Sequence, residues 1–280
     1  MIFGAHVSIA GGIEYAPERA KDLGADALQI FASPPQTFTF SPPNEFQIEL
    51  FRHRVKQARI DPVFFHGVYL INLASDIPQN LNLSVKSLTS YQHLAFRVGA
   101  KGTIFHLGSH KGKGFKKVFA TVVNSLRQIL NETNPDLFLV IENSVASAGK
   151  IGGRFGEIGA IVKEVKDLRL KVCLDTCHLF VSGYPIHQKD GLEKTLKEFG
   201  KEVGFERLVV IHANDSRTPF LSAIDRHEDI GKGYIGLQGF KNIVNHKRLR
   251  HLPFIIETPG FEDKVPDQKN LEILRSLVRV

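Results

Sequence analysis

The stretch LVVIHANDSRTPFLSAIDRHEDIGKGYIG, residues 208–236, joins a short apolar strand to a loop rich in polar side chains. Leu208 to Ile211 form an uninterrupted apolar run, which is typical of a strand buried on both faces of a parallel sheet. The run ends at His212, and the loop then places Asp225 and His227 two positions apart. Imidazole and carboxylate groups are ligands of zinc-like cations. The stretch therefore predicts a metal site at the end of a strand in an α/β fold.

The same alternation of apolar strand and helical pattern runs through the whole chain. The expected strands are residues 2–8, 27–33, 63–68, 103–109, 137–144, 170–178, 208–215 and 254–260. The expected helices are residues 14–23, 45–59, 81–98, 115–130, 155–166, 191–203, 237–244 and 266–278. Strict alternation implies parallel strands with right-handed crossovers, and eight such units imply a closed (β/α)8 TIM barrel. We expect a single domain over residues 1–280, with its chemistry on the C-terminal rim.

Composition limits the function classes. The chain has 36 Lys+Arg against 29 Asp+Glu, a formal net charge of +7 that only weakly favours a polyanionic partner. The N-terminus lacks a basic leader, and the most apolar run, 63–74, is too short to cross a bilayer. We expect a soluble, cytoplasmic protein with no membrane partner. Cys173 and Cys177 are expected to be free thiols, with soft zinc ligands as the alternative.

Imidazoles and carboxylates gather at the expected strand ends. Alone, each has a simple explanation, such as a satisfied core histidine or a buried ion pair, because a charge that ends an apolar strand is costly unless it is paired or coordinating. Together they predict a site for two or three metals, since they exceed what one zinc ion can take. The nine candidate ligands are His66, His106, Glu142, Asp175, His178, His212, Asp225, His227 and Glu257. Without metal, neighbouring carboxylates would repel one another, so metal is also expected to stabilise the fold.

Three further segments carry charge or glycine. Lys111-Gly112-Lys113-Gly114 follows the fourth strand end and either tracks phosphates or is a solvated loop. His110, just before it, is expected to be an outer-shell or phosphate-facing group. Residues 147–156 are rich in glycine but match no nucleotide-binding pattern, which favours a tight connection near the metals. The basic cluster 246–251 precedes the last strand and is expected to be a solvated turn at the far end of the barrel.

Several motifs resemble those of the endonuclease IV family, the metal-dependent apurinic/apyrimidinic endonucleases of base excision repair. The resemblance covers nearly the whole chain, and the run from Asp225 to Gly236 is its most specific part. The motifs are Gly4-Ala5-His6-Val7-Ser8 with Gly11-Gly12, Tyr69-Leu70-Ile71-Asn72-Leu73, His106 to His110, Ile141-Glu142-Asn143, Cys173 to His178 with Gly183-Tyr184, His212 to Asp215, Asp225 to Gly236, and Glu257-Thr258.

The resemblance implies a DNA-repair phosphodiester hydrolase with three Zn²⁺ per chain, Mn²⁺ being an alternative for part of the metal. One metal would be held by His66, His106 and Glu142, a second by Glu142, Asp175, His212 and Glu257, and a third by His178, Asp225 and His227. Glu142, Asp175 and Glu257 would be the catalytic carboxylates. A water shared by the first two metals would attack the phosphate 5′ to an abasic site, leaving a 3′-hydroxyl and a 5′-deoxyribose phosphate.

The resemblance also implies a partner, duplex DNA with abasic sites, bound by a monomer through loops on the rim. Tyr69 and Leu70 would wedge between base steps and hold a nucleotide out of the stack. Gln36, His110 and Arg226 complete the expected DNA contacts. The loop after the second strand departs from the family pattern, because Gln36 and Phe38 stand where arginine and tryptophan are common, so a weaker minor-groove contact is expected.

Two other functions fit parts of the sequence. A metal-dependent sugar isomerase of the same barrel superfamily would explain the strand-end carboxylates, but it would not need His66, His106, the Asp225–His227 pair or the Tyr69-Leu70 wedge. A non-catalytic lesion-binding protein would be expected to lack one of the carboxylates, and all of them are present.

Overall fold

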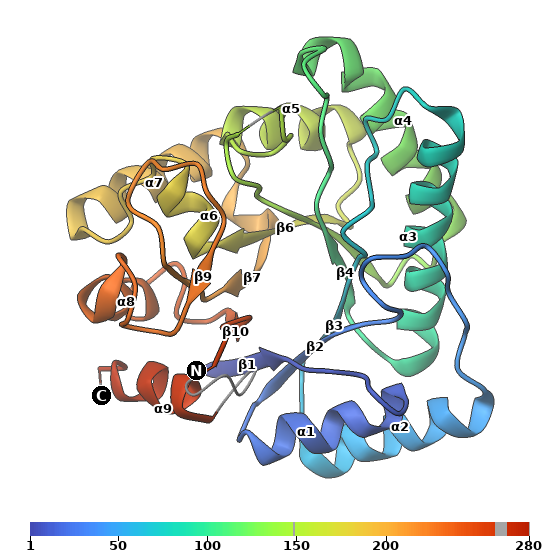
Figure 1. The fold of residues 1–280 in the computed structure, drawn as a ribbon, viewed down its shortest axis with the longest axis horizontal. Coiled ribbons are helices and arrows are strands. Elements are labelled where there is room, and N and C mark those ends of the chain that lie inside the picture. The colour runs from blue at the N-terminus through green and yellow to red at the C-terminus, as the bar shows by residue number, and fades with distance from the viewer. Residues whose placement is uncertain (148, 261–267, 280) are drawn as a thin grey trace.

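Eight parallel strands close into a barrel, in the order β1-β10-β7-β6-β5-β4-β3-β2. The computed structural model describes residues 1–147, 149–260 and 268–279. The barrel strands are β1 (Ile2–His6), β2 (Ala27–Phe31), β3 (Val63–His66), β4 (Gly102–Phe105), β5 (Phe138–Glu142), β6 (Leu170–Asp175), β7 (Leu208–His212) and β10 (Pro253–Ile256). The predicted TIM barrel is thus confirmed, and Figure 1 shows the strands inside a ring of helices.

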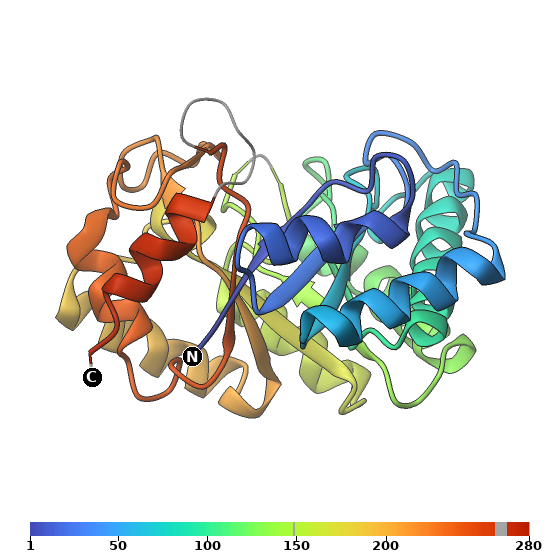
Figure 2. The ribbon, with the colours of Figure 1, turned by 90° about the horizontal axis from the view of Figure 1, so that it is seen from below.

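The ring consists of one helix for each strand. Its members are α1 (Ala16–Asp22), α2 (Glu45–Ala58), α3 (Pro78–Val98), α4 (Phe115–Glu132), α5 (Phe155–Val165), α7 (Lys189–Glu202), α8 (Gly236–Val244) and α9 (Gln268–Ser276). Figure 2 shows from the side how α1 and α2 lie along the outside of the strands. A single-turn 3-10 helix, η1 (Ile13–Tyr15), precedes α1, and η2 (Phe205–Arg207) precedes β7. The expected start of the last helix, at residue 266, lies outside the described residues.

Each expected barrel strand extends two to four residues beyond the end of the observed one, and two of these differences affect the site. The predicted strand 170–178 is too long: β6 ends at Asp175, whose side chain accepts a hydrogen bond from the His178 N–H and begins the helix α6 (Thr176–Val181). An aspartate at the N-cap satisfies a free N–H of the first turn. The predicted strand 208–215 likewise ends at His212, and β8 (Asp215–Ser216) pairs antiparallel with β9 (His227–Glu228). This hairpin was not predicted, and it ties His227 to the segment that follows β7.

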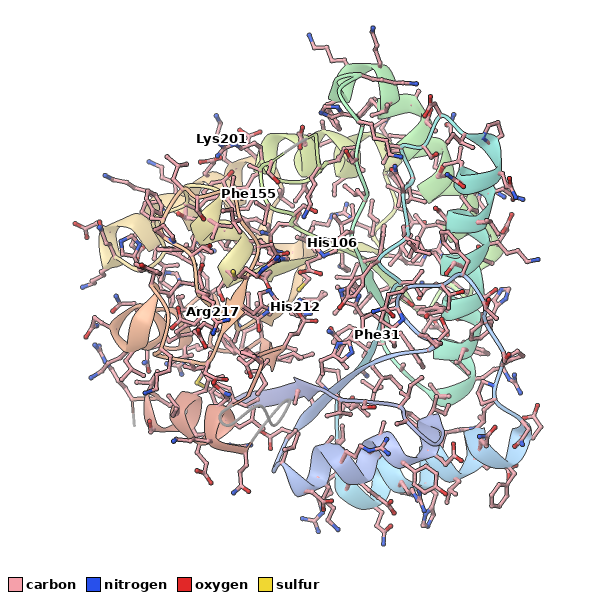
Figure 3. All side chains as sticks on the ribbon, viewed as in Figure 1. Phe31, His106, Phe155, Lys201, His212 and Arg217 are labelled. Atoms are coloured by element: carbon pink, nitrogen blue, oxygen red, sulfur yellow. The ribbon has the colours of Figure 1, made fainter. Side chains whose placement is uncertain are left out.

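The barrel interior is layered. Its lower layer is apolar and contains Ala27, Phe64, Ile104, Val140, Cys173, Val210 and Ile255. Because side chains alternate along a strand, the residue two positions later faces the same way. That position is polar on every strand: His6, Gln29, His66, His106, Glu142, Asp175, His212 and Glu257. Figure 3 shows His106 and His212 near the middle of the ring of strands.

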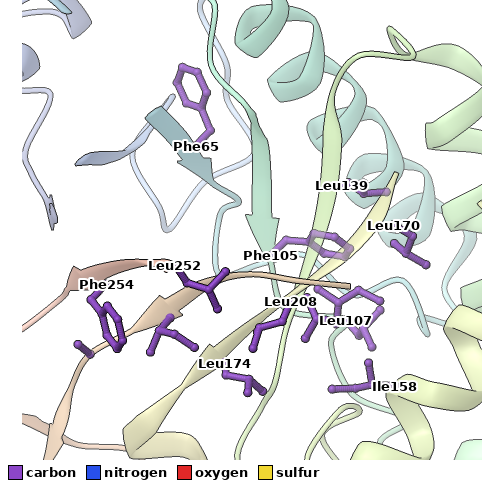
Figure 4. Packing of buried hydrophobic residues seen from close by; sticks show 14 of the residues in the cluster. Phe65, Phe105, Leu107, Leu139, Ile158, Leu170, Leu174, Leu208, Leu252 and Phe254 are labelled. Atoms are coloured by element: carbon purple, nitrogen blue, oxygen red, sulfur yellow. The ribbon is translucent and has the colours of Figure 1, made fainter. Parts of the chain in front are cut away.

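The opposite strand faces pack against the helices in one continuous core. Phe65, Phe105, Leu139, Leu170 and Phe254 are all buried in it, and Figure 4 shows part of this packing. At about 25 cal/mol per Å² of buried apolar surface, this core is the main stabilising term and holds the rim in place. Within the described residues, no helix combines the length and the apolar composition needed to cross a bilayer.

Candidate metal centre

The polar layer opens into a cavity of ≈ 490 Å³ at the C-terminal rim. Seven of the nine candidate ligands come from the ends of β3, β4, β5, β6, β7 and β10 and from α6. The other two come from the β8–β9 hairpin: Asp225 lies in its connecting loop, and His227 lies in β9. His6, Phe31, Tyr69 and Arg226 are among the other residues that line the cavity. All nine candidate ligands therefore lie in one place, although they span residues 66 to 257 of the sequence.

The first group is formed by His66, His106 and Glu142, whose ligand atoms lie within 4.8 Å of one another. Nε2 of His66 is 3.0 Å from Oε2 of Glu142, and Nε2 of His106 is 3.4 Å from the same oxygen. His66 and Glu142 are almost fully buried, so water cannot screen these groups.

The second group contains Glu142 again, with Asp175, His212 and Glu257. Nδ1 of His212 is 3.3 Å from Oε1 of Glu142 and 3.4 Å from Oε2 of Glu257. The two oxygens of Glu142 therefore face different groups: Oε2 faces the first group, and Oε1 faces His212 of the second group and lies 3.2 Å from Nδ1 of His178. That is the arrangement of a carboxylate that bridges two cations.

The third group lies on the side of α6 and contains His178, Asp225 and His227. Nε2 of His178 is 3.0 Å from Oδ2 of Asp225, and Nε2 of His227 is 3.5 Å from Oδ1 of the same residue. Nε2 of His227 is also 3.7 Å from Oδ2 of Asp175, which links this group to the second one.

All five histidines of these groups have one ring nitrogen anchored and the other directed at a carboxylate. The anchored nitrogen of His66 lies 2.8 Å from the Gly67 carbonyl, that of His178 lies 2.9 Å from the Asn143 carbonyl, and that of His227 lies 3.3 Å from the Glu257 carbonyl. The anchored nitrogen of His106 lies 3.2 Å from the Ser144 hydroxyl, and that of His212 lies 2.8 Å from the Gln29 amide oxygen. Four of these partners are carbonyl oxygens, which only accept, so the ring nitrogens of His66, His178, His212 and His227 that face them carry the proton. In a neutral ring the other nitrogen then presents a lone pair to a carboxylate, and a cation fits between two such donors.

Unsatisfied polar atoms point to the same conclusion. Within the described residues, Oε1 of Glu142, Nδ1 of His212 and Nε2 of His227 are buried and have no hydrogen-bond partner. An unpaired buried polar atom costs on the order of 1–3 kcal/mol. Here all three atoms face candidate ligands, so a shared cation would satisfy them together.

The pKa values show how strongly these groups act on one another without metal. Burial alone would raise the pKa of Glu142, but the imidazoles of His106 and His212 hold it well below its usual range. Burial lowers the pKa of His106 to about 4. Burial would also lower the pKa of His178, yet Asp175 and Asp225 raise it well above 6.5. Without metal, protons on some of the imidazoles therefore balance the carboxylates.

Asn214 supports the second group and was not singled out from the sequence. Its Nδ2 donates to Oδ2 of Asp175 (2.6 Å) and to Oε2 of Glu257 (3.3 Å), and its Oδ1 accepts from the Glu257 N–H. Thr176 fixes the backbone of Asn214 through two further bonds. The signal was present, because Asn214 lies two residues beyond His212 in the same loop, but an amide is not a usual ligand of zinc.

Of the candidate DNA-contacting residues, Tyr69 and Arg226 line the cavity. Tyr69 is 63% and Leu70 is 45% exposed, so two large apolar side chains that are adjacent in the sequence are both open to solvent. The Tyr69 N–H donates to the Pro35 carbonyl, so its loop lies beside the one that carries the exposed Gln36. On the other side, Asn72 bonds both the N–H and the carbonyl of Ser109. The loop of Tyr69 and Leu70 is therefore hydrogen-bonded to the neighbouring loops on both sides, at Pro35 and at Ser109.

Arg226 and His110 differ in their surroundings. Arg226 is exposed and lines the cavity, and its guanidinium donates to the Asp225 carbonyl. Nδ1 of His110 accepts a hydrogen bond from the Gly114 N–H, so this ring helps to shape the Lys111–Gly114 loop. Lys113 in that loop pairs with Asp76. The role of His110 in DNA binding stays a prediction.

Both cysteines are buried and free. Burial raises the pKa of each thiol to about 12. The Sγ of Cys177 lies near Asp175 and His227 and donates to the Arg226 carbonyl, 3.7 Å away. A thiol that stays protonated is a poor metal ligand, which favours the interpretation of these residues as ordinary buried thiols.

Comparison with known proteins shows which family the chain resembles. A family model described as "Xylose isomerase-like TIM barrel" matches residues 17–277. Proteins named "Probable endonuclease 4" are similar over nearly the whole length. The one from Halothermothrix orenii is 37% identical and the match covers 98% of this chain and 99% of that protein. The one from Aquifex aeolicus is 38% identical, with 99% and 97% covered.

Solved structures agree with these matches. The crystal structure of endonuclease IV from Thermus thermophilus superimposes with a TM-score of 0.87 at 31% identity, covering 99% of this chain and 98% of that one. A D-tagatose 3-epimerase-like protein superimposes with a TM-score of 0.78 at 18% identity, covering 99% and 97%. At that identity the second likeness shows the shared barrel alone.

Proposed function

We propose, because this chain belongs to the endonuclease IV family of xylose isomerase-like TIM barrels, that it hydrolyses the phosphodiester 5′ to abasic sites in duplex DNA. The products would be a 3′-hydroxyl and a 5′-deoxyribose phosphate. The observation that carries the proposal is the set of five anchored imidazoles whose free nitrogens face shared carboxylates at the barrel rim. We further propose that residues 1–280 act as one domain and as a monomer.

The donor set fits zinc. Imidazole nitrogen together with carboxylate oxygen suits Zn²⁺, or Mn²⁺ in part, better than Mg²⁺, which prefers oxygen ligands and keeps its water. We propose that the first, second and third groups hold one ion each, with Glu142 shared by the first two. When bound, zinc supplies Lewis acidity toward phosphate oxygens and lowers the pKa of water to about 7.

The chain's own residues would bind and orient the DNA. Arg226 lines the cavity as an exposed cation and would meet a phosphate there. Tyr69 lines the cavity, and together with the adjacent, exposed Leu70 it would take the place of the displaced base pair. Asn214 would keep the carboxylates of Asp175 and Glu257 directed at the same point. Gln36 and His110 would contact the backbone on either side of this wedge.

The deciding experiment is an incision assay on a duplex with one tetrahydrofuran abasic analogue, run beside elemental analysis of the purified protein. We expect a single cut on the 5′ side of the analogue, an undamaged duplex left intact, and about three equivalents of zinc. A protein that carries no metal and leaves the abasic duplex uncut, or one that converts a ketose instead, would contradict the proposal.

Tyr69→Ala should weaken the binding of the abasic duplex about tenfold, because stacking on an aromatic side chain contributes about 1–3 kcal/mol. The zinc content should not change, since Tyr69 is outside the three groups. Binding is measured by fluorescence anisotropy with a labelled duplex. Tyr15→Ala, which removes another exposed tyrosine that does not line the cavity, is the matched control. Equal affinities of the two variants would rule out a wedge at Tyr69.

Gln36→Arg should tighten DNA binding and make it more sensitive to salt. One added phosphate contact steepens the slope of log K against log salt by about 0.9. Anisotropy titrations at several salt concentrations measure this slope. Gln128→Arg adds the same charge at an exposed position near the end of α4 and serves as the control for net charge alone. A slope that rises equally in both variants would mean that the loop of Gln36 does not reach the duplex.

A further inference from the structure

A buried glutamine stands beneath the cavity, and it belongs to none of the three groups. Gln29 is the only polar residue of β2 and is fully buried. It occupies the inward position two residues after Ala27, in the same layer as the candidate ligands. Burying an amide costs about 1–3 kcal/mol unless its hydrogen bonds are made. The partners of this amide therefore indicate what it does.

All three bonds of the Gln29 side chain go to residues that line or form the metal centre. Its Nε2 donates to Oε1 of Glu257 at 2.6 Å and lies 2.8 Å from Nδ1 of His6. Its Oε1 lies 2.8 Å from Nε2 of His212. An amide has two N–H donors, and both of them are used here, along with one acceptor.

The orientation of the amide follows from chemistry. An ionised carboxylate only accepts, so the NH₂ group, and not the oxygen, must face Glu257. The oxygen then faces His212, and it requires a proton on Nε2 of that ring. Nδ1 of His212 is left with a lone pair, and this is the atom that lies between Glu142 and Glu257.

The second N–H of Gln29 determines the state of His6 in the same way. Nδ1 of His6 lies 2.8 Å from the amide nitrogen of Gln29 and 3.4 Å from Oε1 of Glu257. Because an amide NH₂ cannot accept, the closer contact requires Nδ1 to be the acceptor, and a neutral ring then carries its proton on Nε2. His6 lines the cavity, and its ring packs on Phe31, with 4.5 Å between the ring centroids. No described residue forms a hydrogen bond with Nε2 of His6. An N–H donor at a cavity wall, with no protein acceptor, suits a phosphate oxygen.

We propose that Gln29 is a positioning residue that sets the tautomers of two histidines, so that His212 offers its Nδ1 lone pair to the metal and His6 offers its Nε2–H to a phosphate oxygen of the DNA. The role of His6 toward a phosphate oxygen rests on the proposed function. The role of His212 toward the metal concerns the zinc-loaded protein alone and can be tested without DNA.

The direct test needs no substitution. Long-range ¹⁵N–¹H spectra of the zinc-loaded protein report which ring nitrogens carry protons. We expect a proton on Nε2 and none on Nδ1 for both His6 and His212. A proton on Nδ1 of His6, or none on Nε2 of His212, would overturn the proposal. Because the spectra do not depend on incision, they separate this inference from the proposed function.

Two variants then test the roles of His212 and His6 separately. Gln29→Met keeps the chain length but removes all three hydrogen bonds, and the zinc affinity, measured by competition with a chromophoric chelator, should fall about 10- to 100-fold. His6→Phe keeps the packing on Phe31 but removes the N–H. With saturating zinc, His6→Phe should bind the abasic duplex about tenfold more weakly than the unaltered protein, while its zinc affinity is unchanged.

Gln92→Met is the matched control. Gln92 is an equally buried glutamine, and its amide bonds the hydroxyl of Thr103 and the carbonyl of Phe138 instead of the metal centre. This variant should lose stability and keep both affinities. If Gln29→Met also kept its zinc affinity, or if His6→Phe bound DNA normally, the corresponding half of the proposal would be wrong. Failure of the unaltered protein to incise, with the expected tautomers present, would count against the proposed function only.

Discussion

Replacing Glu142 by glutamine should reduce incision of the abasic duplex by at least about 10³-fold, which corresponds to about 4 kcal/mol at 1.36 kcal/mol per tenfold. The reason is the position of Glu142 between two groups. Its Oε2 faces His66 and His106, and its Oε1 faces His212. An amide can present oxygen to only one side, and its NH₂ group repels a cation on the other. One of the two groups would therefore lose a ligand, and the site would lose one negative charge.

The measurements are single-turnover incision and zinc content by elemental analysis, both on the purified variant. We expect the zinc content to fall below that of the unaltered protein. The matched control is Glu14→Gln, since Glu14 is also a buried carboxylate but accepts hydrogen bonds from Gln47 outside the centre. Full activity and full zinc content in Glu142→Gln would show that this residue is not a shared ligand.

Removing the metal should lower the melting temperature by on the order of 10 °C at pH 8. Bound ligand present at about 1,000 times its dissociation constant stabilises a protein by about 4 kcal/mol. One kcal/mol corresponds to about 2–4 °C for a chain of 150–250 residues. When the metal leaves, only protons on the neighbouring imidazoles offset the charges of the buried carboxylates Glu142 and Asp175.

The size of this effect should depend on pH. In the metal-free protein the pKa values of His178 and His212 are raised well above 6.5 by the neighbouring acidic groups. A raised pKa contributes stability that is fully present below about 6.5 and is lost as the pH rises through the folded-state value. Zinc binding instead requires neutral imidazoles and strengthens as the pH rises. The gap between the zinc-loaded and metal-free melting temperatures should therefore widen from pH 6.5 to pH 9.

Calorimetric melting of both forms across this range measures the gap. His246→Gln is the control, because His246 is a buried imidazole paired with Glu193 outside the centre, at 3.2 Å. The His246→Gln variant should melt at a lower temperature in both the zinc-loaded and the metal-free form, and the difference between the two forms should be unchanged. Identical melting of the two forms of the unaltered protein at every pH would contradict the view that metal supports the fold.

The sequence was sufficient for the barrel and for the residues at its rim, because both depend on local patterns. Apolar runs such as Leu208–Ile211 identify strands, and polar residues at their ends must meet on one edge when the strands are parallel. The resemblance to the endonuclease IV family was confirmed by relatives over the full length. That the nine residues bind metal stays a proposal, although the structure brings all of them together.

The parts that the sequence missed depend on contacts between distant segments. His178 reads as a strand end, but the side chain of Asp175 starts a helix there. The segment that follows the β8–β9 hairpin is held to it over a distance in sequence, because the carboxylate of Asp215 accepts N–H groups from residues as far away as Ile235 and Gly236. Gln29 was overlooked because an amide does not look like a ligand. Counting two positions on from the inward Ala27 would have identified Gln29.

The attachment of Tyr69 and Leu70 to the two neighbouring loops has a thermodynamic consequence. Pro35 holds one side of this segment, and Asn72 fastens the other to Ser109, so the segment is in place before any duplex arrives. A pre-organised recognition element gives up little conformational entropy on association. Most of the free-energy cost of binding a lesion then comes from unstacking the DNA. A duplex that is already unstacked at the damaged step should therefore bind in preference to an intact one.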